Sequence, residues 1–218
     1  MNDTENQSKR HIYALIDSLN NHRAFPHLLN VAVKELSTVL LVEKNIITSM
    51  EVGGNEVLMS VLKECSHHDT IPLYTLKAIL ALLRSPISTE SMCTALMQDN
   101  FLQVVQTILQ PTGIKRASNS TCEVAIEIML EASNSFNDQP QHQLGAAIIF
   151  LVMESRCVSG KLLEVCCRML ITLGQFTDSI LGDEANVRRI LSSITQYEKN
   201  AEEDDEQTSF AILQLMNR

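Results

Sequence analysis

The chain has 218 residues, of which 45% are hydrophobic and 20% charged, with a formal net charge of −9 and a mean hydropathy of +0.04. A chain of this length buries roughly 70% of its unfolded surface, so length and composition together exclude a mostly disordered or collagen-like protein. With 7 Gly, 5 Pro, 4% aromatic residues and no Trp, the composition favours helices over sheets.

Acidic charge is concentrated in the C-terminal half. Residues 1–119 hold 10 Lys and Arg against 11 Asp and Glu, whereas residues 120–218 hold 7 against 15. The acidic half repels phosphate and no basic stripe with interleaved aromatic residues compensates, so direct nucleic-acid binding is not expected. No apolar run reaches the roughly 18 to 20 residues that cross a bilayer, and the N-terminus is polar and acidic, so we expect neither a membrane contact nor export.

The chain opens with an amphipathic pattern. Residues 4–20 place Ile12 and Ile16 on one helical face, and Pro26 suits the first turn of a second helix. We therefore expect residues 1–26 to form an N-terminal cap on the helices that follow.

Five long helical segments recur along the rest of the chain. Their aligned apolar positions are spaced by 43, 49, 41 and 43 residues, which is the range of helical repeats. These positions are Leu36, Ile79, Ile128, Met169 and Ile212. The first four are expected to be buried. We also expect more than 60% helix and essentially no strand.

The stretches between the recurring segments also share an order. Each holds a short helix, a tight turn and a medium helix: 45–52, Gly53-Gly54 and 55–63 after the first segment, and 89–97, 98–100 and 101–109 after the second. The third stretch departs from this order, because the polar loop 133–140 leads into an apolar helix at 144–153. The order returns after the fourth segment, with a turn at Gly182-Asp183-Glu184.

This order resembles the armadillo repeat, and the residues that carry the likeness are MEVGGNEVLMSVL followed by IPLYTLKAILALL. The resemblance covers roughly residues 27–218, and it implies an all-α fold: a right-handed α-solenoid of about four armadillo-like repeats, the last unit incomplete. The whole chain, 1–218, is expected to be a single domain. Armadillo proteins that bind basic import signals carry a ladder of Trp and Asn on their third helices. This sequence has no Trp and no repeated Asn there, so that function is not supported.

Enzyme motifs are absent where a sequence can test them. GxGxxG, the Walker A motif, GxSxG and HExxH do not occur, and Ser159-Gly160-Lys161 lacks the glycine and the strand of a phosphate loop. We expect no catalytic residues, no cofactor and no enzyme activity.

Cysteine and histidine suggest chemistry at two places. Cys65, His67, His68 and Asp69 are metal-ligand types, but no second ligand pair exists, so a solvated turn is favoured over zinc. Adjacent Cys166 and Cys167 point about 100° apart on a helix, so we expect at most one to face the core fully. All six cysteines, which include Cys157, are expected to be free thiols, and the protein to be cytoplasmic, nuclear or both.

Two surface segments remain open between alternatives. The run Lys115-Arg116-Ala117-Ser118 resembles a basophilic kinase site, although an unmodified loop is favoured. The acidic run 201–206 is either a hydrophilic linker, which we favour, or a contact for a basic partner.

The functional expectation is a non-catalytic protein-binding module or scaffold. A partner peptide or helix, basic where it meets the acidic half, would contact the polar positions of the recurring helices on the concave face. The positions that we expect to touch the partner are Lys34, Glu35, Lys77, Glu127 and Arg168. The alternative is a regulatory subunit or adaptor that controls a partner enzyme or small GTPase, and a pull-down would separate the two.

Overall fold

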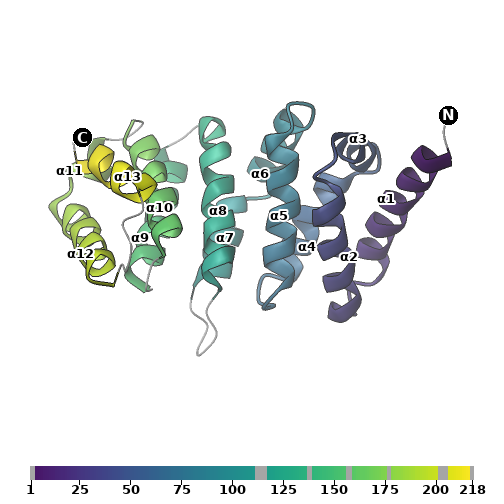
Figure 1. Ribbon diagram of the computed structural model, residues 1–218, viewed down its shortest axis with the longest axis horizontal. Helices are drawn as coiled ribbons and strands as arrows, with labels where there is room; N and C mark the ends of the chain where they lie inside the picture. Colours follow the sequence, from purple (N-terminus) through teal and green to yellow (C-terminus); the bar gives the residue numbers. More distant parts are fainter. Residues whose placement is uncertain are drawn as a thin grey trace. The chain divides into compact units, whose positions relative to one another are not determined.

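The computed structural model describes residues 3–110, 117–136, 139–155, 159–175, 178–200 and 206–216. Helix accounts for 84% of these described residues, and they contain no strand. The all-α prediction is therefore confirmed (Figure 1). Within the same residues, no helix is both long and apolar enough to cross a membrane.

The chain divides into two compact units, Met1–Ile108 and Leu109–Arg218. The single domain expected over 1–218 stays a prediction. The helices of the first unit are α1 (Asp3–Asn21), α2 (Pro26–Val39), α3 (Glu43–Glu51), α4 (Gly54–Glu64), α5 (Ile71–Arg84), α6 (Thr89–Gln98) and α7 (Phe101–Leu109), whose last residue passes the boundary.

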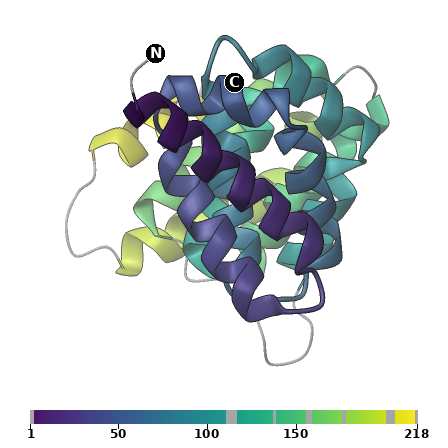
Figure 2. The ribbon, with the colours of Figure 1, turned by 90° about the vertical axis from the view of Figure 1, so that its right-hand side faces the viewer.

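Helix α1 covers the beginning of the first unit. It contacts α2, α3 and α4, and Figure 2 shows it in front of α2. Its apolar positions Ile12, Ile16 and Leu19 are buried, as the amphipathic pattern of residues 4–20 predicts. Burial of this one stripe explains why a helix with so many polar residues is held against its neighbours.

The two tight turns of the first unit share an unusual backbone conformation. Gly53 precedes α4 with φ of 72°, and Asn100 precedes α7 with φ of 52°. Both are in the left-handed region, which glycine adopts freely and asparagine tolerates. The next residue in the first turn, Gly54, leaves no room for a side chain, because a Cβ there would lie 2.9 Å from the Ser49 carbonyl oxygen.

A side-chain hydrogen bond to the backbone carbonyl six residues earlier recurs where one helix leads into the next. Asn45 donates from Nδ2 to the Val39 carbonyl at 2.8 Å, and Thr89 donates from Oγ1 to the Leu83 carbonyl at 2.8 Å. In the second unit Asn186 donates to the carbonyl six residues before it, at 3.0 Å. Each of these hydrogen bonds satisfies a carbonyl near the end of a helix, where the helix itself provides no donor.

The second unit is built around α10. Its elements are α8 (Asn119–Glu131), a 3-10 turn at Ser133–Ser135, α9 (Gln139–Ser155), α10 (Gly160–Gly174), α11 (Asp178–Gly182), α12 (Glu184–Asn200) and α13 (Glu206–Met216). Helix α10 contacts α8, α9, α11 and α13. It is therefore enclosed on several sides.

This enclosure corrects the expectation for the adjacent cysteines. Cys166 and Cys167 are both fully buried, because helices pack against α10 from more than one direction. Burial raises the pKa of the Cys167 thiol to about 12, with Glu164 adding to the effect. The pKa of Cys166 is also raised well above its usual value, mainly by burial and then by Cys167.

The recurring segments of the sequence correspond to α2, α5, α8, α10 and α13, which we call the recurring helices. Within the first unit α2 packs on α5, and within the second α10 packs on both α8 and α13. The aligned positions Leu36, Ile79, Ile128 and Met169 are all fully buried, as predicted. The apolar periodicity therefore identified the packed face of each of these four helices.

Candidate partner-binding faces

The five residues predicted to touch a partner lie on four recurring helices. Lys34 and Glu35 are on α2, Lys77 is on α5, Glu127 is on α8 and Arg168 is on α10. Four of them are exposed, but the Glu127 side chain is only 17% exposed. The structure thus offers two helix pairs to consider, α2 with α5 and α8 with α10.

On α2 and α5, two of the predicted residues meet at an aromatic ring. The Lys34 ammonium lies 5.7 Å from the centre of the Tyr74 ring, and the Lys77 ammonium lies 5.6 Å from it. A cation over an aromatic face is worth about 0.5–1 kcal/mol at an exposed site. Neither lysine forms an ion pair with a carboxylate in the described part of the chain.

Tyr74 was missed as a candidate, although its position one turn before Lys77 was a usable signal. Residues three apart on a helix lie on the same face, and Lys34 is aligned with Lys77 by the 43-residue spacing. The sequence therefore indicated that Tyr74 lies on the same helical face as Lys77 and close to the position aligned with Lys34.

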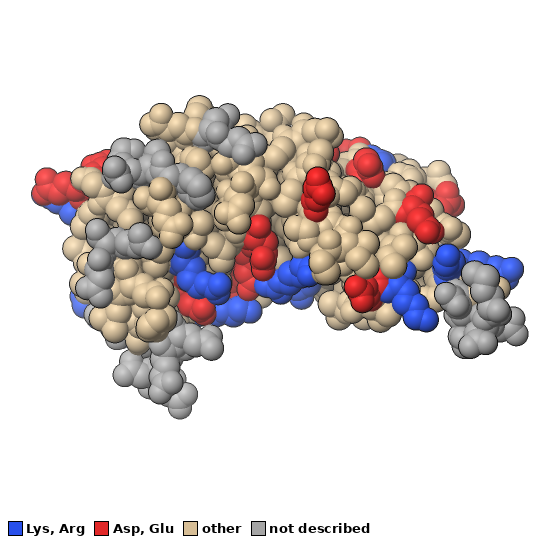
Figure 3. All heavy atoms as spheres, turned by 90° about the horizontal axis from the view of Figure 1, so that it is seen from above, with Lys and Arg blue, Asp and Glu red and all other residues tan. Residues whose placement is uncertain are grey.

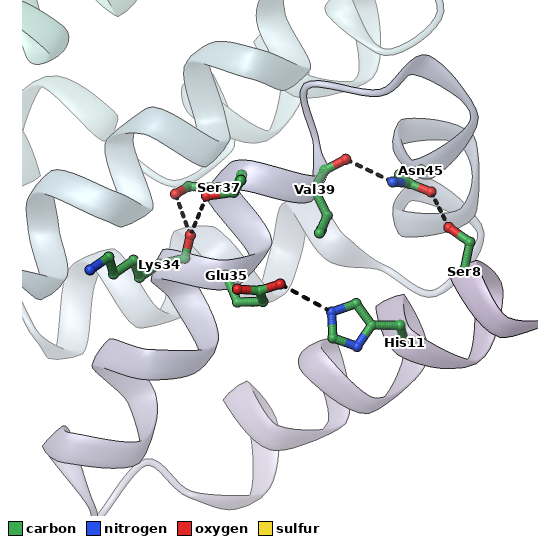
Figure 4. A network of polar contacts seen from close by, with 8 residues as sticks. Ser8, His11, Lys34, Glu35, Ser37, Val39 and Asn45 are labelled. Atoms are coloured by element: carbon green, nitrogen blue, oxygen red, sulfur yellow. Dashed lines mark hydrogen bonds and ion pairs between the residues drawn. The ribbon is translucent and has the colours of Figure 1, made fainter.

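Glu35 does not join Lys34. Figure 4 shows it turned toward α1, where its Oε1 lies 3.5 Å from His11 Nε2, while Lys34 extends in another direction. The same view shows Ser8 donating to Asn45 Oδ1 at 2.7 Å, which links α1 to α3. Glu35 thus contributes to how α1 is held, and it leaves the two lysines without a neutralising partner.

The α2 surface next to Lys34 is apolar. Val31 is 65% exposed and lies one turn before Lys34, and Leu28 is 48% exposed and lies one turn before Val31. We name the set Leu28, Val31, Lys34, Tyr74 and Lys77 the α2–α5 face.

On α8 and α10, the predicted residues have internal partners. Glu127 Oε1 lies 3.7 Å from Lys161 Nζ, and Arg168 lies 3.5 Å from Glu164, one turn before it on the same helix. The carboxylate of Glu123 accepts a hydrogen bond from Ser159 Oγ at 3.0 Å. The contacts of Glu127 and Glu123 join α8 to α10, and the two ion pairs neutralise much of the local charge.

Charges of the two signs also alternate on the wider surface. Figure 3 shows one face on which Lys and Arg lie next to Asp and Glu in several places. The described residues seen there form no continuous patch of one sign. The place where a charged partner can bind is therefore better indicated by a local pair such as Lys34 and Lys77 than by the total charge of either half.

The turn after α4 holds the residues considered as metal ligands. The rings of His67 and His68 lie 4.7 Å apart, and Cys65 is buried, which raises its pKa, with Glu64 adding to the rise. Over the described ranges, no three His, Cys, Asp or Glu side chains gather closely enough to hold a metal ion.

Ser118 lies at the start of α8. It is exposed as a residue, but its Oγ accepts a hydrogen bond from the Thr121 backbone N–H at 3.1 Å, so it caps the helix. The basic pair Lys115-Arg116, residues 201–205 of the acidic run and Cys157 lie outside the described residues. The other five cysteines are free, and Cys93 is the one of them that is not buried.

Comparison with protein-family models, curated proteins and solved structures finds no match for this chain.

Proposed function

We propose that the chain is a non-catalytic protein-interaction module, a short right-handed α-solenoid of armadillo-like repeats that binds a peptide or helix of a partner protein on its concave face. The observation that carries the proposal is the nearly constant sequence separation of contacts between distant segments. In a repeat protein each unit touches its neighbours, so such contacts are separated by about one repeat.

Side-chain hydrogen bonds within each unit follow this rule. In the first unit, Asn55 bonds to Ser91, 36 residues away, and Thr70 bonds to Asn30, 40 residues away. In the second unit, Ser159 bonds to Glu123 at a separation of 36, and Ser193 bonds to the Met153 carbonyl at a separation of 40. Packing of α2 on α5 and of α10 on α8 and α13 agrees with the same order.

Exposed positions on the recurring helices support a binding role for them. Lys34, Lys77, Lys161 and Arg168 are exposed although the helices that carry them also supply much of the core. Repeated helices of this kind present parallel rows of side chains, which suits recognition of an extended or helical segment.

Crosslinking of the full chain to a captured partner tests the proposal. With a lysine-reactive reagent, we expect partner crosslinks at Lys34, Lys77 or Lys161, which lie on recurring helices. Lys44 on α3 and Lys63 on α4 serve as internal controls, because those helices are not expected to line the binding face. Partner crosslinks confined to the control lysines contradict the proposal, as does a chain that binds no partner segment.

A further inference from the structure

We infer that the α2–α5 face binds a peptide segment that carries acidic side chains beside apolar ones. The inference rests on the proposed function and adds the chemical class of the partner at this face. It differs from the sequence expectation, which placed a basic partner segment on the acidic C-terminal half.

The first step is the convergence of two positive charges. Lys34 and Lys77 come from different helices, yet their ammonium groups lie at 5.7 and 5.6 Å from the centre of one ring, that of Tyr74. The two ammonium groups are therefore at most about 11 Å apart. A carboxylate placed near the Tyr74 ring is attracted by both positive charges.

The second step is that no carboxylate of the described residues forms an ion pair with Lys34 or Lys77. Glu35 follows Lys34 directly, but it lies at 3.5 Å from His11 on α1. Among the described residues, the lysines of this pair have no ion-pair partner, in contrast to Lys161, which is paired with Glu127. The positive charge of the face is therefore available to a ligand.

The third step is the adjoining apolar surface. Val31 exposes 65% of its surface and Leu28 exposes 48%, and Tyr74 between the lysines is partly exposed. A ligand that offers only charge, such as a free phosphate, leaves Leu28 and Val31 in water. A peptide with alternating acidic and apolar side chains covers both, because apolar burial provides affinity and charge provides orientation.

A displayed library of random 12-residue peptides, panned against the folded full chain, tests the inference. We expect enriched peptides to carry Asp or Glu together with Leu, Ile or Phe. Fluorescence anisotropy of the best synthetic peptide should show affinity falling about tenfold or more in the variant K34E/K77E, which turns two attractions into repulsions. Affinity should also fall as salt rises from 50 to 300 mM.

The matched control is the variant R10E/K44E, which changes net charge equally at exposed positions on α1 and α3. It should keep the affinity within about twofold. Circular dichroism verifies that both variants are folded, and Y74L tests the ring without changing charge and should weaken binding by a smaller factor.

The outcomes separate this inference from the proposed function. Peptides that bind wild type and K34E/K77E equally, or that are enriched without acidic residues, overturn this inference and leave the interaction module standing. A library that yields no binding peptide counts against both. Binding of phosphatidylserine vesicles that depends on Lys34 and Lys77, without any such peptide, assigns the face to a membrane surface and also overturns the inference.

Discussion

The recurring helices begin differently in the two units. In the first unit α2 and α5 carry Pro26 and Pro72 in their first turns and have no side-chain cap. In the second unit Ser118 and Ser159 cap α8 and α10 by accepting a hydrogen bond from a backbone N–H of the first turn. Proline in the first turn removes an amide donor that would otherwise lack a partner, and serine provides a partner for one. The same architectural position is thus stabilised by two different means.

The exposed charges of these helices differ as well. Lys34 and Lys77 of the first unit lack carboxylate partners among the described residues, whereas Glu127 and Glu164 of the second unit are paired with Lys161 and Arg168. The half with the larger net charge is therefore the half whose recurring helices are better neutralised. Net charge of a segment does not reveal which charges a partner can reach.

The largest expected effect tests whether the cores of the two units are equivalent. Ile79→Asp and Met169→Asp should each lower the free energy of unfolding by roughly 3 to 5 kcal/mol, because each places an unpaired charge in a fully buried position. Urea denaturation followed by circular dichroism measures this. Lys77→Gln, on the exposed side of the helix that holds Ile79, should cost no more than about 1 kcal/mol, the value of its contact with the Tyr74 ring. A small effect at either core position breaks the equivalence.

Thiol reactivity compares a partly exposed cysteine of the first unit with a buried cysteine of the second. With iodoacetamide at pH 8, Cys93 of the first unit should react at least about a hundredfold faster than Cys167 of the second, because the thiolate is the nucleophile and Cys167 is buried with a pKa of about 12. Since folding raises this pKa, its contribution to stability is complete below pH 9 and is lost as the pH rises toward 12. Mass spectrometry of time points identifies the site. Equal rates in native protein contradict the burial of α10.

Alanine substitutions at two turn glycines, Gly54 and Gly182, compare a crowded position with an open one. Gly54→Ala should cost about 1–3 kcal/mol, since the new Cβ would lie 2.9 Å from the Ser49 backbone oxygen. At the turn of the second unit, a Cβ on Gly182 meets nothing within 4 Å, so Gly182→Ala should change stability by no more than about 0.5 kcal/mol. Thermal melting compares the pair, and equal losses show that crowding is not what distinguishes them.

The serine caps predict a smaller difference within the second unit. Ser118→Ala should cost about 1 kcal/mol through loss of the cap. Both serines make a second hydrogen bond, Ser118 with Thr121 Oγ1 at 2.9 Å and Ser159 to the Glu123 carboxylate at 3.0 Å. Ser159→Ala should cost more, because its second hydrogen bond is to a charged group and is therefore stronger. Ser120→Ala, at an exposed position in the first turn of α8, is the control for helix propensity. A larger loss at Ser118 than at Ser159 contradicts the greater strength of the second hydrogen bond at Ser159.

The smallest expected effect concerns the pair Glu127 and Lys161. A double-mutant cycle with Glu127→Gln and Lys161→Met should give a coupling energy of about 0.2–1 kcal/mol, because the lysine is 64% exposed and screened by water. The coupling should shrink in 0.5 M salt. A coupling energy of zero at low salt shows that Glu127 and Lys161 do not neutralise each other. The difference from Lys34 and Lys77, which have no carboxylate partner among the described residues, would then be smaller.

Periodicity was sufficient to predict the packed positions. Leu36, Ile79, Ile128 and Met169 were identified because an apolar residue recurs wherever a helix faces the core, and this needs no knowledge of the neighbouring helix. The Gly53 turn was predicted for a similar reason, since the special backbone conformation is local.

The apolar periodicity of the sequence could not predict which side chains of different helices contact one another. The contact between Glu127 and Lys161 spans 34 residues, and the burial of both Cys166 and Cys167 depends on how many helices surround α10. The error at the cysteines came from treating α10 as a helix with one buried side. The pairing of Lys34 and Lys77 at Tyr74 likewise depends on how closely α2 approaches α5.

The nearly constant separation of distant contacts has a consequence for synthesis of the chain on a ribosome. Closing a loop costs entropy that grows with its length, and here Asn30 with Thr70 and Asn55 with Ser91 close loops of 40 and 36 residues. These contacts therefore need no segment from the far end of the chain. Once Arg84 has left the exit tunnel, α2 and α5 have every residue that they need to pack on each other, and apolar surface is covered while translation continues.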